Sequence, residues 1–234
     1  ATLMARDSDD FNRWEAGQRL AGDFILRRAA ALGQGGDLAP SPALLAAFAS
    51  VLAGAMRDPA FAAEALSLPS ETYLAEQMDM VDPDALHAAR IRLRRELAAH
   101  MRLAWLVAYD TCRVPGPYSP EPAAAGRRAL RNLALGYLME LDEAPLRALC
   151  LEQFHTADNM TDAMAALVAL ANCDCPERGQ ALEAFYQRWQ DEPLVVDKWL
   201  SVQATSRLPN TLQTVQRLTT HPAFDLRNPN KVYA

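Results

Sequence analysis

The sequence predicts an all-α fold, an irregular α-solenoid of stacked antiparallel helix pairs. Three observations lead to this class. Half of the 234 residues are hydrophobic, and Ala and Leu, which are strong helix formers, dominate over the β-branched residues that favour strands. Proline and capping residues recur between stretches with apolar residues at helical spacing. Sustained alternation bounded by hairpin signals, which is typical of strands, does not occur.

Each helical stretch in the first half of the chain begins with a capping signal. After the capping residues 7–10 we expect a helix, ended by Gly33, with one apolar face made of Phe11, Trp14, Ala21, Phe24 and Ile25. Further helices are predicted to follow Ser41, Asp58, Ser70 and Asp82, three of which precede a proline suited to the first helical position. The stretch after Asp82 is predicted to be the longest helix, running to about residue 111.

The second half of the chain follows a proline-rich segment. Residues 113–122 hold four prolines and a glycine and are predicted to form a loop. Helical patterns then cover 123–140, 143–156, 160–172, 177–190, 194–205 and 210–220, and Asn228-Pro229 opens a further helix. These roughly eleven helices have short connections and no fixed repeat period, which indicates stacked pairs in a HEAT/ARM-like superhelix.

We expect one α-helical domain over 1–234, and a subdivision near 113–122 is the alternative. Because the chain begins without Met and stops within a helical pattern, the domain is expected to be truncated at its C-terminal end. An apolar face would then be exposed where further helices belong, and self-association through it is a prediction.

The charge pattern argues against nucleic acid as a partner. The formal net charge is −6, and Lys and Arg are scattered rather than gathered into a basic stripe. The densest basic run, Arg90–Arg95, alternates with apolar residues and is interpreted as a solvated helix face or a salt-bridged seam rather than a phosphate site. Apolar runs are too short to cross a bilayer, and residues 1–15 do not form a secretory signal. We therefore expect a cytoplasmic protein without membrane contacts.

The cysteines indicate reduced thiols rather than a disulfide scaffold or a metal site. Four cysteines at 112, 150, 173 and 175 are too few and too scattered for a disulfide framework in a chain of this size. Cys173-Asp174-Cys175 would hold a metal only if His155 lay nearby. The spacing is C-x-C and a second cysteine pair is lacking, so no metal site is predicted.

Signatures of catalysis are absent from the sequence. It contains no H-E-x-x-H, G-x-S-x-G, P-loop or dinucleotide motif, and no catalytic residue is predicted.

The remaining polar residues of note are given structural roles. His221 is expected to bond free carbonyls at a helix end. The polar cluster Asp158–Asp162 is interpreted as a helix cap in preference to a buried polar hub. Asp197-Lys198-Trp199 is interpreted as a helix-packing contact.

Five groups of residues, spread along the chain, form a recognisable series. Each is weak alone, but their order and spacing together are specific and run nearly end to end. The groups are Phe11-Asn12-Arg13-Trp14-Glu15-Ala16-Gly17-Gln18, Leu68-Pro69-Ser70-Glu71-Thr72-Tyr73-Leu74, Asn159-Met160-Thr161-Asp162-Ala163, Asp197-Lys198-Trp199 with Gln203-Ala204-Thr205, and His221-Pro222-Ala223-Phe224 with Asn228-Pro229-Asn230.

Together these groups resemble aminopeptidase N, the alanyl aminopeptidase of Gram-negative bacteria, and this resemblance implies a part of a larger enzyme. The family has an N-terminal β-saddle, a thermolysin-like zinc domain, a small β-sandwich and a large helical C-terminal domain, and this chain resembles the start of the last. Zinc and the catalytic glutamate would lie in the catalytic domain, so no cofactor is expected in this fragment. The implied partners are the catalytic and β-sandwich domains of the same polypeptide and a peptide substrate. Gly54–Asp58 resembles the family's substrate loop only by coincidence, because Arg57-Asp58 replaces Glu-Asn.

The resemblance implies that the chain is a non-catalytic domain of a zinc aminopeptidase, which removes N-terminal residues from peptides. The chain would form a wall of the substrate cavity and control the access of peptides to it. Asn228, Asn230 and Lys231 are the candidates for facing that cavity, and the simpler interpretation is a helix N-cap with a solvated lysine. A stand-alone α-solenoid scaffold that binds a protein or peptide is the alternative function. The neighbouring coding sequence would distinguish the two.

Overall fold

The chain is entirely helical in the part that the structure describes. The computed structural model describes residues 1–233, and helices joined by loops make up all of its regular secondary structure. The predicted all-α fold is therefore confirmed. The chain divides into two compact units, Ala1–Leu141 and Asp142–Ala234. The proline-rich segment 113–121 lies inside the first unit as the connection between two helices, and the prediction of a single domain with an alternative subdivision near 113–122 stays a prediction.

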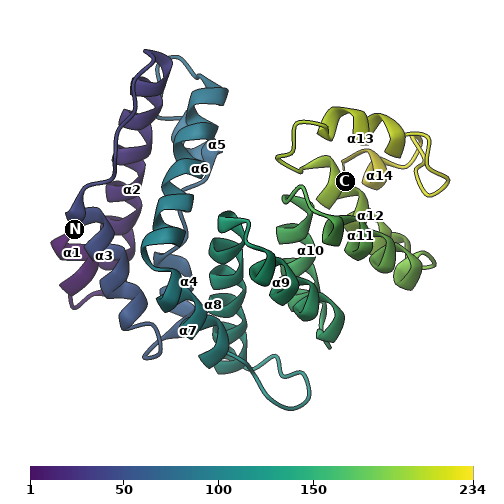
Figure 1. Cartoon of the computed structure of the whole chain (residues 1–234), viewed down its shortest axis with the longest axis horizontal. Coiled ribbons are helices and arrows are strands. Elements are labelled where there is room, and N and C mark those ends of the chain that lie inside the picture. The colour runs from purple at the N-terminus through teal and green to yellow at the C-terminus, as the bar shows by residue number, and fades with distance from the viewer. Residues whose placement is uncertain (234) are drawn as a thin grey trace. The chain divides into compact units, whose positions relative to one another are not determined.

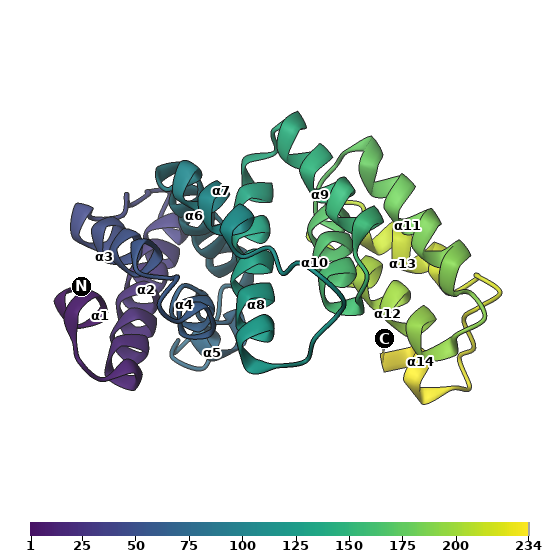
Figure 2. The same cartoon turned by 90° about the horizontal axis from the view of Figure 1, so that it is seen from below.

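The first unit is built around two long helices and the shorter helices that pack on them. Helix α2 lies along α6, while α4 and α7 both pack against α8, as Figures 1 and 2 show. Its elements are α1 (Thr2–Arg6), α2 (Asp10–Gly33), α3 (Pro42–Ala53), α4 (Pro59–Ala65), α5 (Glu71–Ala75), α6 (Pro83–His100), α7 (Arg102–Thr111), α8 (Pro122–Leu138) and the 3-10 turn η1 (Met139–Leu141).

The helix starts follow the predicted caps. The side chains of five N-cap residues each accept a hydrogen bond from a backbone N–H in the first turn, which satisfies a donor that the helix itself cannot. Proline occupies the first turn of α3, α4 and α6, where its missing N–H costs nothing. The capping residues are Asp9, Ser41, Asp58, Ser70 and Asp82.

The stretch predicted as one long helix to residue 111 is two helices. It breaks at Met101, which ends α6 and precedes α7. Met101 departs from helical geometry, with φ −112° and ψ 22°, and the Leu97 carbonyl oxygen accepts both the Met101 backbone N–H at 3.2 Å and the Trp105 indole N–H at 3.3 Å. The longest helix is α2, with 24 residues.

Stacked aromatic rings hold the centre of the first unit. Trp105 and Tyr137 are both buried, with ring centroids 4.3 Å apart and an interplanar angle of 11°. The Tyr137 hydroxyl donates to the Leu66 carbonyl at 2.7 Å, and the Arg94 guanidinium lies over the Tyr137 ring at 5.0 Å. Tyr137 therefore ties α8 to α6, to α7 and to the end of α4.

The second unit is a series of helices in which each packs on the next. Helix α9 packs on α10, α10 on α11, α11 on α12 and α12 on α13, and α14 also packs on α12. The boundaries agree with the predicted ranges to within a few residues. The helices are α9 (Ala144–Thr156), α10 (Met160–Ala171), α11 (Pro176–Trp189), α12 (Pro193–Ala204), α13 (Thr211–Leu218) and α14 (Pro229–Tyr233).

Candidate functional site

The cysteines and histidines do not assemble a reactive centre. Within residues 1–233, no three side chains among His, Cys, Asp and Glu are grouped so as to hold a metal. The Cys173 thiol donates to Asp142 Oδ1 at 3.1 Å, and burial raises the pKa of the thiols of both Cys173 and Cys175 above the ordinary value. His155 is exposed, with its ring edge against Phe154. Protonated thiols are poor metal ligands and poor nucleophiles.

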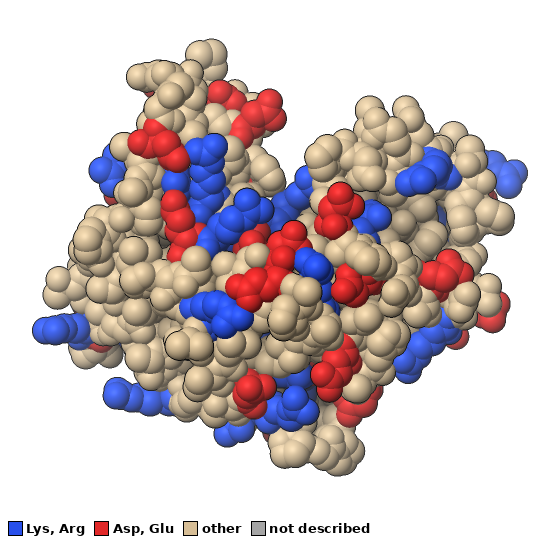
Figure 3. All heavy atoms as spheres, in the orientation of Figure 1, with Lys and Arg blue, Asp and Glu red and all other residues tan. Residues whose placement is uncertain are grey.

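The basic run on α6 is a salt-bridged seam. Arg90 Nε donates to the Pro69 carbonyl at 2.8 Å, Arg92 pairs with Asp37 at 2.7 Å, and Arg94 pairs with Glu140 at 2.9 Å. On the face drawn in Figure 3, acidic and basic side chains are interspersed. The sequence-based interpretation of this run is confirmed.

Within residues 1–233, none of the helices combines the length and the hydropathy that crossing a bilayer requires.

The predicted cap at the start of α10 is confirmed, and it also belongs to a buried polar cluster. Asn159 Oδ1 accepts the backbone N–H of Asp162 at 3.0 Å, and Asn159 Nδ2 donates to Asp162 Oδ2 at 3.1 Å. The Gln153 amide donates to the Asp162 carbonyl at 3.1 Å, and both Gln153 and Asp162 are buried. These bonds fix the α9–α10 turn.

Of the three predicted cavity-facing residues, Lys231 is held inside the second unit. Its Nζ lies 2.6 Å from Asp197 Oδ1 and 3.2 Å from the Pro193 carbonyl oxygen. Only 10% of the Lys231 side chain and 15% of the Asp197 side chain are exposed. The interpretation of Lys231 as a solvated lysine is therefore wrong, because α14 packs its lysine face onto α12.

The two asparagines have different positions in α14. Asn228 is the predicted cap, because its side-chain oxygen accepts the Asn230 N–H at 3.1 Å and its carbonyl accepts the Lys231 N–H at 3.0 Å. Asn230 is exposed, one residue before the buried Lys231. The structure thus brings these residues together at one short helix, with Asn230 directed to the outside of the unit.

An aromatic cluster fixes the segment that leads into α14. The rings of Tyr186, Trp199 and His221 lie within 4.7–5.1 Å of one another, centroid to centroid. The Trp199 indole donates to the Leu182 carbonyl at 2.9 Å, which confirms the predicted helix-packing role of the Asp197–Trp199 stretch. His221 has the predicted structural role, but its bond differs from the expected one: its Nδ1 accepts the backbone N–H of Ala223 at 3.1 Å rather than donating to a helix carbonyl.

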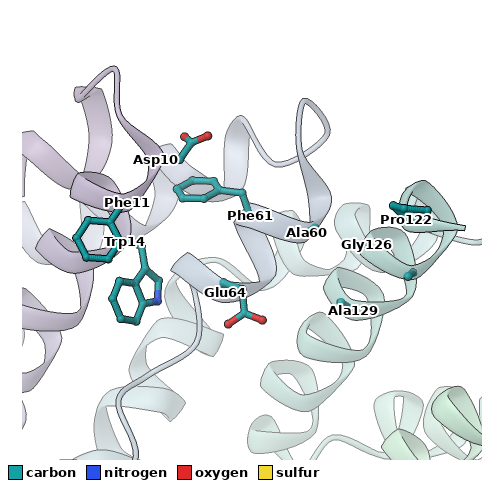
Figure 4. Close-up of a pocket in the computed structure, with 10 residues that line it drawn as sticks. Asp10, Phe11, Trp14, Ala60, Phe61, Glu64, Pro122, Gly126 and Ala129 are labelled. Atoms are coloured by element: carbon teal, nitrogen blue, oxygen red, sulfur yellow. The ribbon is translucent and has the colours of Figure 1, made fainter.

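A shallow groove in the first unit was not predicted. It has a volume of about 610 Å³ and runs between the start of α2, α4 and the start of α8 (Figure 4). Aromatic rings and two carboxylates form one side, and small residues form the other. Its lining residues are Asp10, Phe11, Trp14, Ala60, Phe61, Glu64, Pro122, Ala125, Gly126 and Ala129.

The aromatic side of the groove corrects one prediction for α2. Of the five residues expected to form its apolar face, Ala21, Phe24 and Ile25 are buried, whereas Phe11 is 65% exposed and Trp14 is 36% exposed. Helical periodicity therefore identifies the face of α2 that these rings share, but within this unit the face is only partly covered at the first turns. In the sequence, the two aromatic residues three positions apart, Phe11 and Trp14, were the available signal for this groove.

Two close contacts shape the groove. A Cβ added at Gly126 would lie 3.0–3.3 Å from Ala60 Cβ, N and Cα, so glycine allows α8 to approach the α4 backbone. The Arg13 guanidinium lies 4.5 Å from the Phe61 ring centroid and pairs with Asp10 at 3.1 Å. Arg13 thus joins α2 to α4 through its contact with Phe61, which lines the groove.

The chain is similar to aminopeptidases along its whole length. It is 42% identical to aminopeptidase N of Caulobacter vibrioides over 236 residues, which is 99% of this chain and 26% of that protein. It is 37% identical to aminopeptidase N of Escherichia coli over 230 residues, 98% of this chain and 26% of that protein. The chain thus spans about a quarter of the length of these curated relatives. The resemblance expected from the sequence is confirmed.

A solved structure and a family model agree with this similarity. The crystal structure of Legionella pneumophila aminopeptidase A in complex with aspartic acid superposes with a TM-score of 0.85 at 29% identity, over 99% of this chain and 28% of that one. A family described as a domain of unknown function, DUF3458_C, with ARM repeats matches residues 1–234. The description as ARM repeats agrees with the predicted α-solenoid of packed helix pairs. The chain therefore belongs to the DUF3458_C family of ARM-repeat domains.

Proposed function

We propose that this chain is the non-catalytic helical domain of a zinc aminopeptidase that removes N-terminal residues from peptides, and that it forms a wall of the substrate cavity and controls access. The observation that carries the proposal is similarity over 98–99% of the chain to aminopeptidase N proteins of which it spans 26%. The catalytic and β-sandwich domains of the same polypeptide would be its partners, and the cytoplasm its location.

The residues of this chain do not fit a zinc site. A zinc ligand must be deprotonated, and burial keeps the thiols of Cys173 and Cys175 protonated by raising their pKa. Zinc would therefore be held elsewhere in the complete polypeptide, where it supplies the hydrolytic chemistry. The contribution of this chain is steric: packed helices limit which peptides reach the site and keep water from its walls.

Within this wall, Asn230 is the residue we assign to the cavity. This assignment is supported by the exposure of Asn230 on α14, close to two residues that are held in place. Asn228 caps the helix, and Lys231 forms an ion pair with Asp197. Lys231 would act as a positioning residue that fixes the direction of α14, rather than as a contact to peptide.

The test uses the complete polypeptide encoded by the gene. Asn230→Trp should lower kcat/KM for peptides of five or more residues and leave hydrolysis of alanyl-p-nitroanilide unchanged, because only a long substrate reaches the wall. Gln213→Trp, at an exposed position of α13, is the matched control. Equal kinetics for both variants on long peptides would remove the cavity assignment.

The groove of the first unit favours one alternative, a stand-alone scaffold that binds a protein or peptide. Exposed Phe11 and Trp14 are the kind of surface that binding partners cover. The coding sequence distinguishes the two functions: a scaffold gene would begin and end near residues 1 and 234, whereas the gene of an enzyme part would continue in frame.

A further inference from the structure

We propose that the α2–α4–α8 groove, defined by its ten lining residues, is the surface through which the first unit docks onto another part of the same, longer polypeptide. Its occupant would be a segment that presents an apolar side chain beside a Lys or Arg. This inference rests on the proposed function, because it requires that the chain be part of a larger protein.

The residues around the start of α2 divide into two groups. Arg13, Gly17 and Gln18 serve the unit itself: Arg13 joins α2 to α4, Gly17 leaves space for the Met4 side chain, and the Gln18 amide donates to the Ser67 carbonyl at 2.8 Å. Phe11 and Trp14 instead line the groove (Figure 4), and they are 65% and 36% exposed.

The two exposed rings form one apolar surface. Their centroids are 5.8 Å apart, and Phe61 continues the surface on α4. Among residues 1–233 the Trp14 indole N–H meets no acceptor, so it can donate to a partner's backbone carbonyl. Aromatic residues with one free polar atom in a concave setting are typical anchors of protein interfaces.

The negative charge of the groove favours an occupant with a cationic side chain. Asp10 and Glu64 are its charged lining residues, and cationic side chains are absent from the lining. Arg13 already engages Asp10, whereas the Glu64 carboxylate meets no donor within the described part of the chain. A Lys or Arg beside the Trp14 face would pair with Glu64 and gain a cation–π contact.

Two observations favour another part of the same polypeptide over a second copy of this chain. Three quarters of the length of the curated relatives lies outside the matched region, so most of the surface of such a protein is supplied by other segments. A second copy would also carry a net charge of −6, which opposes its approach to an acidic groove.

The test measures the accessibility of the groove side chains by hydroxyl-radical footprinting. The 234-residue chain and the complete polypeptide are labelled side by side at equal, low concentration, and the complete polypeptide is assayed for peptide hydrolysis in the same preparation. The proposal predicts loss of labelling at Phe11 and Trp14 in the complete polypeptide. A Glu64→Lys variant of the complete polypeptide should regain labelling at both rings, and Glu76→Lys, the same charge change at an exposed residue outside the groove, should not.

Each outcome decides for or against the proposal. Equal labelling of both rings in the two proteins overturns it. Protection that appears in the 234-residue chain as its concentration rises would assign the groove to a second copy, and protection only on addition of peptide would assign it to substrate; both overturn the proposed occupant. A complete polypeptide that protects the rings and hydrolyses no peptide would remove the proposed function and leave the docking surface standing.

Discussion

The ammonium group of Lys231 lies 2.6 Å from the Asp197 carboxylate and connects the short helix α14 to α12. A five-residue helix has little stability of its own. The position of Asn230, the proposed cavity residue, therefore depends on this ion pair. The pair makes α14 part of the second unit rather than a loose end.

Replacing Lys231 by Met should release α14 without unfolding the unit. The variant leaves a mostly buried carboxylate unpaired, which costs about 2 kcal/mol and corresponds to an about thirtyfold larger equilibrium constant for local opening. Hydrogen exchange of the amides of residues 231 and 232 measures this. Lys198→Met, at an exposed position on α12, is the matched control. Unchanged exchange in the Lys231 variant would show that α14 is held by other contacts.

The Arg28–Asp37 pair predicts an acid dependence of stability. The buried Arg28 guanidinium, hydrogen-bonded to Asp37, lowers the pKa of that carboxyl from 3.8 to about 2. Because the folded state holds the charged form, the stability from Asp37 is fully present above about pH 4 and is lost as the pH falls through about 2.

The measurement compares urea unfolding of the wild type and Asp37→Asn between pH 5 and pH 2. The wild type should be more stable at pH 5, and the difference should shrink as the pH falls. Added salt should reduce it at every pH, because the carboxylate is 45% exposed. A difference that is constant across this range would contradict the assigned pairing.

Two glycines in helices should respond to alanine with opposite signs. Gly126→Ala places a methyl group 3.0–3.3 Å from the Ala60 backbone and Cβ, and overpacking of about 1–3 kcal/mol should outweigh the gain in helix propensity. Gly179→Ala meets nothing within 4 Å and should stabilise by about 0.5 kcal/mol. Thermal unfolding of both variants checks the prediction. Stabilisation by Gly126→Ala would mean that α4 and α8 are not in close contact.

Removing the Tyr137 hydroxyl should destabilise the first unit. Tyr137→Phe leaves the Leu66 carbonyl without its donor, at a cost of about 1–2 kcal/mol.

The same hydroxyl predicts a dependence of stability on alkaline pH. Burial raises the pKa of Tyr137 to about 12, so the unfolded state ionises first. The stability from this group is present below about pH 10 and is lost as the pH rises through 12. Urea unfolding of both proteins from pH 8 to pH 12 tests this, and a variant as stable as the wild type at pH 8 would contradict it.

The sequence predicts the helices well where each boundary has a local cause. Asp58 and Asp82 cap helices that open with proline, and Asn159 and Asn228 cap helices of the second unit, so these starts follow from neighbouring residues alone. The break at Met101 lies in a stretch without proline or glycine, so local patterns do not reveal it.

The candidate sites are less predictable because they depend on contacts between distant residues. Periodicity places Phe11 and Trp14 on the apolar face of α2, but it does not say whether a neighbour covers that face. Lys231 reads as a solvated lysine until Asp197, 34 residues earlier, is known to lie beside it. Local spacing identifies side chains that share a face, and tertiary packing decides which of them stay open.

Zinc content and turnover of the 234-residue chain, measured beside the complete polypeptide, decide whether this chain is a non-catalytic part of an aminopeptidase. We expect that the chain alone retains no stoichiometric zinc and does not hydrolyse alanyl-p-nitroanilide, whereas the complete polypeptide does both. Stoichiometric zinc with turnover in the 234-residue chain would contradict it.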